Sequence, residues 1–550
     1  MRAVDVSEHH DERMRAASPR FGRLACLGLT AIVLLLYGQT IPYGYNGLDD
    51  ERMIRKDHTF LKDLSHVPQV FVRDVFGNEE GERHYYRPLL TLSLMLDTQL
   101  GGVDITAFRV TNVLLHALST CLLLYFLMAI GVRRELALFL AIVFAVHPLQ
   151  VIAVAWVPGR NDPLLAVFVL SSLLQLIRFQ RTGSGLACGL HVLCMALALF
   201  TKEAALALLV VQPLLVGLIL HQDLRSGRNR ALGAAWLLVV AVWFWLRSVA
   251  LPSGTGAAIS PVSFLLNLPM LPQYVGKIFF PFNLTLFPTI PDTGFVYGVL
   301  ALGIAIAALV RSREVSWRRV VFGGAWFLAF LLPSMTVGGM PGFEHRMYLP
   351  LVGFMVVLCE TDLLKRADPR SWRFASVASV VIVGFFAISF FRCHVFRDFE
   401  SFWQSAVEGS PHSRLAHLFY GIELEKRERL DEAESLYRAY LERDASKEGI
   451  HHRLAVVLGT QRRFAQAERH FLAELEINPD FADAQFDLGV LYEQSGRASQ
   501  AVELWRQTIE NDPRYVDAYR ALLDHYRARG DRARAREILE EMRRKGIGGP

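Results

Sequence analysis

Four short polar segments of this 550-residue chain carry charged side chains in or beside long apolar runs. Charged groups placed there cost free energy, so they are functional candidates by default. The first segment holds the adjacent carboxylates Asp49 and Asp50, and later Arg87. The other three are HPLQVIAVAWVPGRND, the turn TKE and the sequence GFEHRMYLP; their charged members are His147, Arg160, Asp162, Lys202, Glu203, Glu344, His345 and Arg346.

These residue types suit the transfer of a group from a phosphate-linked donor. Asp49 and Asp50 can act as general base toward an acceptor hydroxyl. They can also bind a divalent cation such as Mg²⁺ or Mn²⁺, with Asp50 as the candidate ligand. Cationic side chains can hold phosphate oxygens and stabilise the charge of a leaving phosphate, and the candidates are Arg87, Lys202 and Arg346. The residues expected to support them are Glu344, His345, His147, Arg160, Asp162 and Glu203.

Each of these residues also has an ordinary structural explanation. The acidic pair could cap a helix, Lys202 and Glu203 could form a neighbouring ion pair, and Arg346 could snorkel to headgroups. A structural role is favoured for His147 and for Arg160. Co-location of the four segments on one membrane face would favour a common site, so their placement relative to the membrane is the next question.

Apolar runs of about 20 residues predict a membrane domain at 24–391 with about eleven spans. The predicted spans are 24–43, 110–131, 136–156, 163–180, 185–201, 204–220, 231–249, 295–310, 320–336, 348–364 and 374–391. Alternate connections are rich in Lys and Arg, which favours a cytoplasmic location for them and for the tail 1–23. All four polar segments then fall on the extracytoplasmic face, including a large first loop at 44–107. The proline-broken stretch 271–290 is predicted to be interfacial or re-entrant.

Composition agrees with two physical classes joined in one chain. The chain is 52% hydrophobic and 20% charged, with a mean hydropathy of +0.29, and the apolar excess lies before about residue 392. The net charge of +5 is spread over short clusters between apolar runs, which argues against a nucleic-acid partner. The six cysteines lie in or beside apolar segments, so neither a disulfide framework nor a metal-type spacing is expected.

After a linker at 392–409, the segment 410–550 repeats with a period of 34 residues. Prolines and small alanines keep this spacing, and a large apolar residue follows each alanine by four positions. The lattice consists of Pro411, Pro479 and Pro513, of Ala433, Ala467, Ala501 and Ala535, and of Tyr437, Phe471, Trp505 and Leu539. This pattern predicts about four tetratricopeptide repeats stacked as an α-solenoid, which commonly binds extended peptide. A structural spacer or an oligomerisation element is the alternative.

The segments GLDDERM, YYRPLLTLS, HPLQVIAVAWVPGRNDPLLAV, KEAALALL and FEHRMYLPLVGF resemble the transmembrane-and-tetratricopeptide-repeat protein O-mannosyltransferases, a family of type C membrane glycosyltransferases. The resemblance implies an all-α fold: a polytopic helical membrane domain of that kind, followed by the repeats. It also implies transfer of a mannose-like sugar from a polyprenyl phosphate to a protein hydroxyl, with inversion. Asp49 or Asp50 would be the base or metal ligand, and Arg346 would contact the donor phosphate. His345 separates Glu344 from Arg346 here, whereas the relatives place the acidic and basic residues side by side.

The implied partners are the lipid-linked donor, membrane lipids and an acceptor protein or peptide held by the repeats. The alanine- and arginine-rich composition and the short loops favour a prokaryotic plasma membrane, with the endoplasmic reticulum as the location in a eukaryote. The Lys and Arg bias of the loops places the repeats outside the cytoplasm. Two other classes stay open: a glycan ligase or polymerase using a diphosphate-linked lipid, and a non-enzymatic membrane scaffold. A transporter is less attractive because the ionisable residues gather at one face rather than at the midplane.

Overall fold

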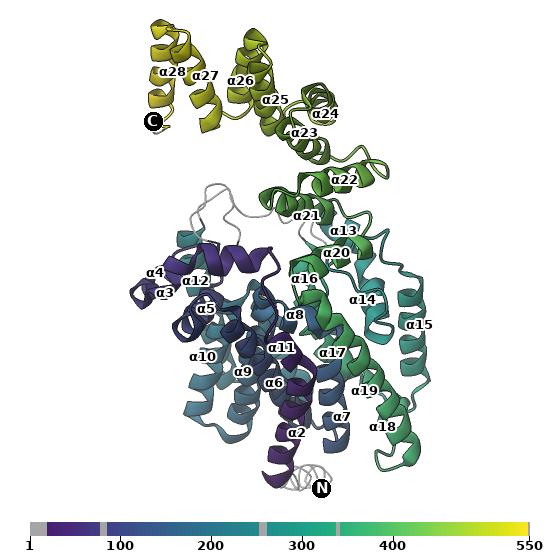
Figure 1. Ribbon diagram of the computed structural model, residues 1–550. Coiled ribbons are helices and arrows are strands. Elements are labelled where there is room, and N and C mark those ends of the chain that lie inside the picture. Colours follow the sequence, from purple (N-terminus) through teal and green to yellow (C-terminus); the bar gives the residue numbers. More distant parts are fainter. Residues whose placement is uncertain (1–18, 77–84, 252–260, 337–341, 548–550) are drawn as a thin grey trace, which may run out of the picture. The chain divides into compact units, whose positions relative to one another are not determined.

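The computed structural model describes residues 19–76, 85–251, 261–336 and 342–547, and every regular element among them is a helix. The chain divides into two compact units, residues 1–409 and 410–550. The predicted all-α class, a helical membrane domain followed by a repeat solenoid, is confirmed (Figure 1).

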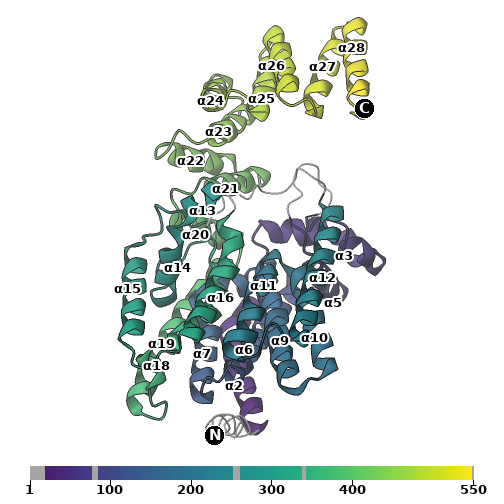
Figure 2. The same ribbon diagram turned by 180° about the vertical axis from the view of Figure 1, so that it is seen from behind.

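The first unit is a bundle of apolar helices joined by short helical turns (Figures 1 and 2). Its α-helices are α2 (Pro19–Tyr37), α3 (His58–Lys62), α4 (Val67–Val70), α5 (Pro88–Gly101), α6 (Ile105–Ala129), α7 (Arg134–Val146), α8 (Val151–Ala155), α9 (Asn161–Thr182), α10 (Gly185–Thr201), α11 (Leu208–Leu214), α12 (Gly227–Ala250), α13 (Pro261–Asn267), α14 (Met270–Phe279), α15 (Val296–Arg311), α16 (Trp317–Met335), α17 (Pro350–Leu358), α18 (Asp362–Lys365), α19 (Trp372–Cys393) and α20 (Phe399–Gly409). Helices α6, α9 and α10 lie side by side, and their facing side chains form a large part of the buried core.

Five helical segments of the described residues are long and apolar enough to cross a membrane, or six if a bent pair counts as one span. They are Arg20–Thr40, Ile105–Ala129, Val157–Thr182, Gly227–Ala250 and Trp372–Phe396, and the bent pair is Arg134–Val146 with Pro148–Ala155. The Trp372–Phe396 segment leaves most of its apolar side chains uncovered by protein, as expected of a helix that faces lipid. The unit is therefore an integral membrane domain.

Several of the about eleven predicted spans are short or broken helices in the structure, and the number of spans stays a prediction. The predicted span 136–156 bends by 50° at Pro148. The predicted span 204–220 is assembled from 3₁₀, α and π turns around Pro213. A proline lacks the N–H that continues the helical ladder, so such breaks follow from the sequence. The stretch 271–290 contains only α14, whose 10 residues at about 1.5 Å each cannot cross a membrane.

Two segments predicted as connections turn out to be folded. The predicted loop 44–107 contains the π-helix η2 (Glu51–Lys56), α3, α4 and α5, which pack around a small apolar core of their own. The predicted linker 392–409 is almost entirely helical, and Trp403 of α20 is buried, with its indole N–H donating to the carbonyl of Asn46. Both segments were predicted as connections because their helices are shorter than a membrane span.

The second unit contains four pairs of antiparallel helices, one pair for each predicted repeat. They are α21 (Arg414–Lys426) with α22 (Leu430–Leu441), α23 (Ile450–Thr460) with α24 (Phe464–Ile477), α25 (Ala482–Gln494) with α26 (Ala498–Asn511), and α27 (Val516–Ala528) with α28 (Arg532–Arg544). The four lattice alanines are all buried between paired helices, as predicted. In the last pair, Ile538 is fully buried in place of the predicted Leu539.

Candidate active site

The acidic pair at the start of the first outer segment splits into two environments. Asp50 is fully buried at the N-cap of η2, where its two oxygens accept the backbone N–H groups of Asn46 (2.8 Å) and Glu51 (2.9 Å). Burial raises the pKa of Asp50, and the Asn46 hydrogen bond partly opposes that rise. Asp49 is half-buried, and its charge acts on the phenol of Tyr85, on the far side of that segment. Asp49 is therefore the less buried carboxylate of the pair, and it accepts neither of the two backbone hydrogen bonds made by Asp50.

Arg87 is presented by the start of α5, where Pro88 occupies the first helical position. Its guanidinium donates hydrogen bonds of 2.7 and 3.3 Å to the two carboxylate oxygens of Glu203. It also lies over the Tyr85 ring, 4.4 Å from the ring centroid. Burial opposes the charge on Arg87, but Glu203 and other neighbouring anions outweigh it and raise the pKa of Arg87. Burial also opposes the negative charge of Glu203, yet Arg87 and Lys202 hold the pKa of Glu203 at about 2. Both partners thus remain charged at neutral pH.

Lys202 lies where α10 ends and the chain turns into the 3₁₀ helix η6 (Glu203–Ala207). Its extended backbone, with φ −160° and ψ 139°, separates the directions taken by Lys202 and Glu203. The ammonium donates to one oxygen of Asp162 at 2.7 Å, and both side chains are mostly buried. The ion pair predicted between the neighbours Lys202 and Glu203 is therefore replaced by two longer-range pairs that cross from α9 and α5 to this turn.

The third predicted phosphate-binding residue, Arg346, comes from the 3₁₀ helix η8 (Glu344–Met347), just before α17. Its guanidinium lies over the Phe343 ring at 5.2 Å. Burial lowers the pKa of the adjacent His345 well below its ordinary value, and the charges of Lys202, Arg346 and Arg87 lower it further. The charges of three cations from distant parts of the chain therefore act on one neutral imidazole, and two of these cations, Arg87 and Lys202, also keep a carboxylate partner.

Several buried polar atoms near these cations have no hydrogen-bond partner among the described residues. Buried polar groups are normally paired, so a group of them without partners at one place indicates room for a polar ligand or water. The His345 ring lies 6.3 Å from that of Trp156, and the turn holding Gln150 packs against η8. The unpaired atoms are Gln150 Nε2 and Oε1, Trp156 Nε1, Asn161 Oδ1, Asp162 Oδ2, His345 Nδ1 and Arg346 Nη1.

Three predicted supporting residues form contacts that join neighbouring helices. Glu344 is fully buried and accepts from Lys277 (3.0 Å), Arg392 (2.5 Å) and the Thr285 N–H (2.8 Å), which ties η8 to α14 and α19. Arg160 is fully buried and pairs with Asp97 at 2.5 Å. Its remaining N–H groups donate to residues of α5 and α6. Both side chains are engaged with protein partners, so they would support a site by holding η8, α5 and α6 in place, and their supporting role stays a prediction.

His147 is the third of these residues. Its Nε2 lies 3.0 Å from the Ile278 carbonyl, and its Nδ1 accepts the Leu149 N–H at the bend between α7 and α8. It caps the turn that Pro148 begins. The sequence favoured this structural reading, and the geometry agrees with it.

The sequence missed Tyr85, Gln150 and Trp156 as members of the site. All three stand inside the polar segments already singled out, beside Arg87 and between His147 and Arg160. They were not predicted because one uncharged polar side chain beside an apolar run costs less free energy than a charged one and marks a site less clearly.

The predicted metal ligand Asp50 is a poor fit to a cation, because both of its oxygens already accept backbone N–H groups. Across the described ranges, no group of three or more His, Cys, Asp or Glu side chains is arranged to hold a metal ion. Metal dependence stays a prediction.

Fold and site together define a helical membrane protein with a cluster of buried charged and polar side chains and with C-terminal tetratricopeptide repeats. Residues 452–504 and 492–550 match the family described as tetratricopeptide repeat. Among solved structures, the chain is similar to MamA (19% identity, TM-score 0.24, 26% of this chain and 88% of that one). It is also similar to ArnT from Cupriavidus metallidurans bound to undecaprenyl phosphate (16% identity, TM-score 0.38, 87% of this chain and 79% of that one).

Curated relatives carry the name that the motifs led us to expect. The chain is 30% identical over 210 residues to Protein O-mannosyl-transferase TMTC2 of Mus musculus, which covers 36% of this chain and 24% of the relative. It is 32% identical over 188 residues to the Homo sapiens protein of that name, which covers 31% and 22%. The chain thus aligns with about a quarter of the length of the curated relatives it matches. The predicted resemblance to the protein O-mannosyltransferases is confirmed.

Proposed function

We propose that the chain is a membrane glycosyltransferase that moves a mannose-like sugar from a polyprenyl phosphate to hydroxyl groups of extracytoplasmic proteins. The observation that carries the proposal is the convergence of Arg87, Lys202 and Arg346 around His345, beside partnerless polar atoms. Similarity to relatives named protein O-mannosyl-transferases supports the same class. The repeats would engage the acceptor protein.

In this proposal the cations hold the donor phosphate. Arg346 is the first candidate, because its Nη1 has no hydrogen-bond partner among the described residues and is therefore available to a phosphate oxygen. Arg87 and Lys202 each keep one carboxylate partner, so they would act on the phosphate through the electrostatic field of their charges more than through direct contacts. The partnerless oxygens and N–H groups near Trp156 and Asn161 would bind the hydroxyl groups of the sugar.

Asp49 is the proposed general base. Its carboxylate would accept the proton of the acceptor hydroxyl while that oxygen bonds to the anomeric carbon of the sugar. The bond from the anomeric carbon to the phosphate oxygen breaks with its electron pair, and the polyprenyl phosphate leaves. Attack from the face opposite the leaving group inverts the anomeric centre. The surrounding cations stabilise the charge that grows on the phosphate, which is where electrostatic catalysis is strongest.

The test is turnover by the full chain reconstituted in lipid with a panel of polyprenyl-phosphate and polyprenyl-diphosphate sugars and an acceptor peptide. Release of the lipid phosphate from a monophosphate donor is expected for the wild type. Arg346→Gln should lower turnover by about 10²–10³-fold, the usual loss for removal of one preorganised donor at a developing charge. Arg311→Gln, an exposed arginine at the end of α15, is the matched control and should have no effect.

Two outcomes would overturn the proposal. Turnover only with a diphosphate-linked oligosaccharide would move the chain to the ligase or polymerase class. If no donor of the panel is turned over and the Asp49 and Arg346 variants still complement a deletion strain, the result would favour a non-enzymatic membrane scaffold.

A further inference from the structure

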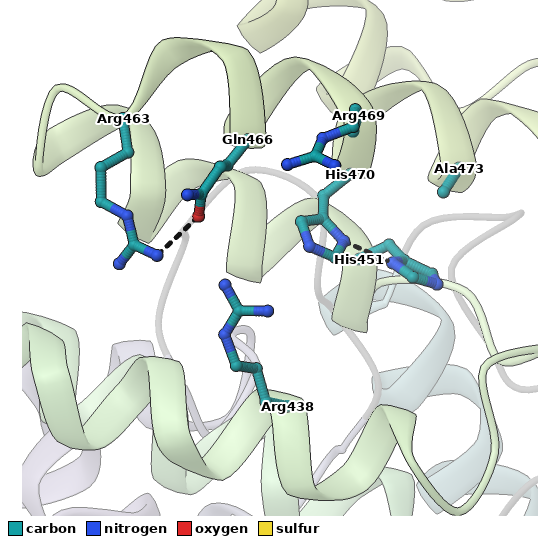
Figure 3. A pocket seen from close by; sticks show the side chains of 7 residues that line it. All are labelled: Arg438, His451, Arg463, Gln466, Arg469, His470 and Ala473. Atoms are coloured by element: carbon teal, nitrogen blue, oxygen red, sulfur yellow. Dashed lines mark hydrogen bonds between the residues drawn. The ribbon is translucent and has the colours of Figure 1, made fainter.

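A cavity of about 520 Å³ opens between helices of the first two repeats, well apart in sequence from the proposed transferase site. Figure 3 shows Arg438 of α22 pointing across it toward side chains of α24. We name this cavity the basic pocket, and it is lined by Arg438, His451, Arg463, Gln466, Arg469, His470 and Ala473. No carboxylate belongs to this lining.

Positive charge exceeds negative charge at the basic pocket. Glu434 is the nearest acid, and its two oxygens are shared between Arg438 (2.8 Å) and Arg463 (2.5 Å). Arg469 is exposed and makes no hydrogen bond or ion pair with any residue in the described ranges. Two of the three guanidinium groups thus share one carboxylate and the third has none among the described residues, and guanidinium forks match the geometry of carboxylates.

The repeat lattice shows that this charge is specific to one interface. The positions 34 residues after the lining residues hold Leu472, Gln485, Arg497, Gln500, Glu503, Leu504 and Gln507. This corresponding groove has one arginine and one glutamate in place of three arginines and two histidines. Packing of the repeats alone therefore does not require the basic pocket, which would be costly in self-repulsion if nothing bound there.

The two histidines make the basic pocket responsive to protons. His451 Nδ1 lies 3.0 Å from His470 Nδ1, so one nitrogen must be unprotonated when they share a hydrogen bond. Burial, His451, Arg438 and Arg469 lower the pKa of His470 to about 4, with Glu434 opposing. Burial also lowers the pKa of His451, and the charge of Glu474 and a hydrogen bond to the Ala445 backbone oppose this shift. An anion in the pocket would offset these repulsions and raise both pKa values.

We propose that the basic pocket binds an acidic segment of a protein, rich in Asp and Glu, and binds it more tightly as the pH falls. The only rings lining it are those of the two histidines, which makes it unlike the aromatic platforms that stack nucleobases. Its lining has no large apolar side chain to receive an acyl chain. Carboxylates presented along an extended segment match its three guanidinium groups. The proposal goes beyond the transferase site and does not depend on it.

The test measures fluorescence anisotropy of a labelled peptide of alternating Glu and Ser, and of its Gln counterpart, with the full chain in detergent. We expect the Glu peptide to bind and the Gln peptide not to bind. Between about pH 7.5 and pH 5.5 the affinity should rise about tenfold, since uptake of one proton changes affinity by up to tenfold per pH unit. Glutamates of the peptide stay ionised over this range because their ordinary pKa is about 4.3.

Variants separate the pocket from general charge. Arg469→Gln removes a side chain that holds no partner in the described fold, so it should fold normally and weaken the Glu peptide about tenfold, the value of one charge-assisted hydrogen bond. Arg438→Gln should weaken it similarly. Arg506→Gln is the matched control, because Arg506 is exposed on α26 at the position two repeats after Arg438. His470→Gln should keep binding at the higher pH and lose the increase at the lower pH.

Three results would overturn the proposal. Equal binding of the Glu and Gln peptides would exclude recognition of carboxylates. Equal losses of affinity in the Arg438, Arg469 and Arg506 variants would show that the peptide is attracted by the overall positive charge and not by a specific site. Binding to vesicles containing anionic lipid, without any binding of the Glu peptide, would assign the basic pocket to a membrane surface instead.

Discussion

The two adjacent carboxylates Asp49 and Asp50 should respond in opposite ways to the same substitution. Asp49→Asn replaces the proposed general base by an amide of the same size and leaves the two backbone hydrogen bonds accepted by Asp50 in place. A positioned general base contributes about 10²–10⁴-fold, so turnover should fall by that factor while the protein stays folded. In free energy this is about 3–5 kcal/mol of transition-state stabilisation.

Asp50→Asn should instead weaken the fold. Asp50 accepts two backbone N–H groups at 2.8 and 2.9 Å, and an amide has only one oxygen, so its NH₂ group would face one of those donors. Loss of a hydrogen bond to a charged group costs about 1.5–3 kcal/mol. Relief from burying a charge offsets part of this, which leaves a net loss of about 1–2 kcal/mol. Turnover by the protein that remains folded should stay within about tenfold of wild type.

The assay is lipid-phosphate release normalised to the monodisperse fraction from size-exclusion chromatography, beside a thermal denaturation curve for each variant. Glu51→Gln is the matched control, because Glu51 belongs to the same motif but its side chain pairs outward with Arg55 at 3.2 Å. An Asp49→Asn protein that turns over normally, together with a stable but inactive Asp50→Asn protein, would refute the reasoning and exchange the two roles.

Three further predictions concern the surrounding structure. Glu344→Gln should destabilise the membrane unit by about 3–5 kcal/mol, because it leaves two buried cations without their shared carboxylate, and thermal denaturation of the purified protein measures this. Glu203→Gln should leave a stability deficit at neutral pH: the folded-state pKa of Glu203 is lowered to about 2, so the Arg87 pair stabilises the fold above the ordinary Glu pKa of about 4.3 and loses this effect as the pH falls toward 2. Gly421→Ala should destabilise the first repeat by about 1–3 kcal/mol, because a Cβ there would lie 2.1 Å from the Tyr437 ring, and hydrogen exchange of α21 reports it.

Each of these has its own control. For Glu344→Gln it is Glu408→Gln, an exposed glutamate of α20, and equal denaturation curves would contradict the buried triad. For Glu203→Gln, a deficit that persists unchanged at the lowest pH would show that the ion pair is not its source. For Gly421→Ala the control is Gly459→Ala on α23, where the new Cβ meets only ordinary contact at 3.9 Å. Equal exchange in both glycine variants would contradict the steric argument.

The repeat unit was determined almost completely by local sequence. Four alanines at a spacing of 34 residues define where two helices approach, and each repeat contacts mainly its neighbours, so no distant information is needed. Only the identity of the last packed residue, Ile538 rather than Leu539, required the structure. The membrane class of the first unit followed equally from apolar composition, because a spanning helix needs little beyond length and hydrophobicity.

The candidate site was only partly determined by the sequence. The cost of placing charge beside apolar runs singled out the right segments, and Arg87, Lys202 and Arg346 do converge. Charge alone could not tell which polar residues are consumed by the fold. Arg160 and Glu344 are charged residues beside apolar runs, as Arg346 is, and the sequence does not distinguish them from it. Their partners, Asp97 and Arg392, lie 63 and 48 residues away along the chain.

The difference between a ligand-binding charge and a structural one therefore rests on tertiary contacts. Asp49 and Asp50 are neighbours with the same side chain, yet only Asp50, at the N-cap of η2, is fully buried and accepts two backbone N–H groups. Broken spans show the same limit, since Pro148 and Pro213 mark where helices fail but not how the halves pack. The sequence determines which charged groups are expensive to bury, and only the fold decides which of them are already paired with another part of the protein.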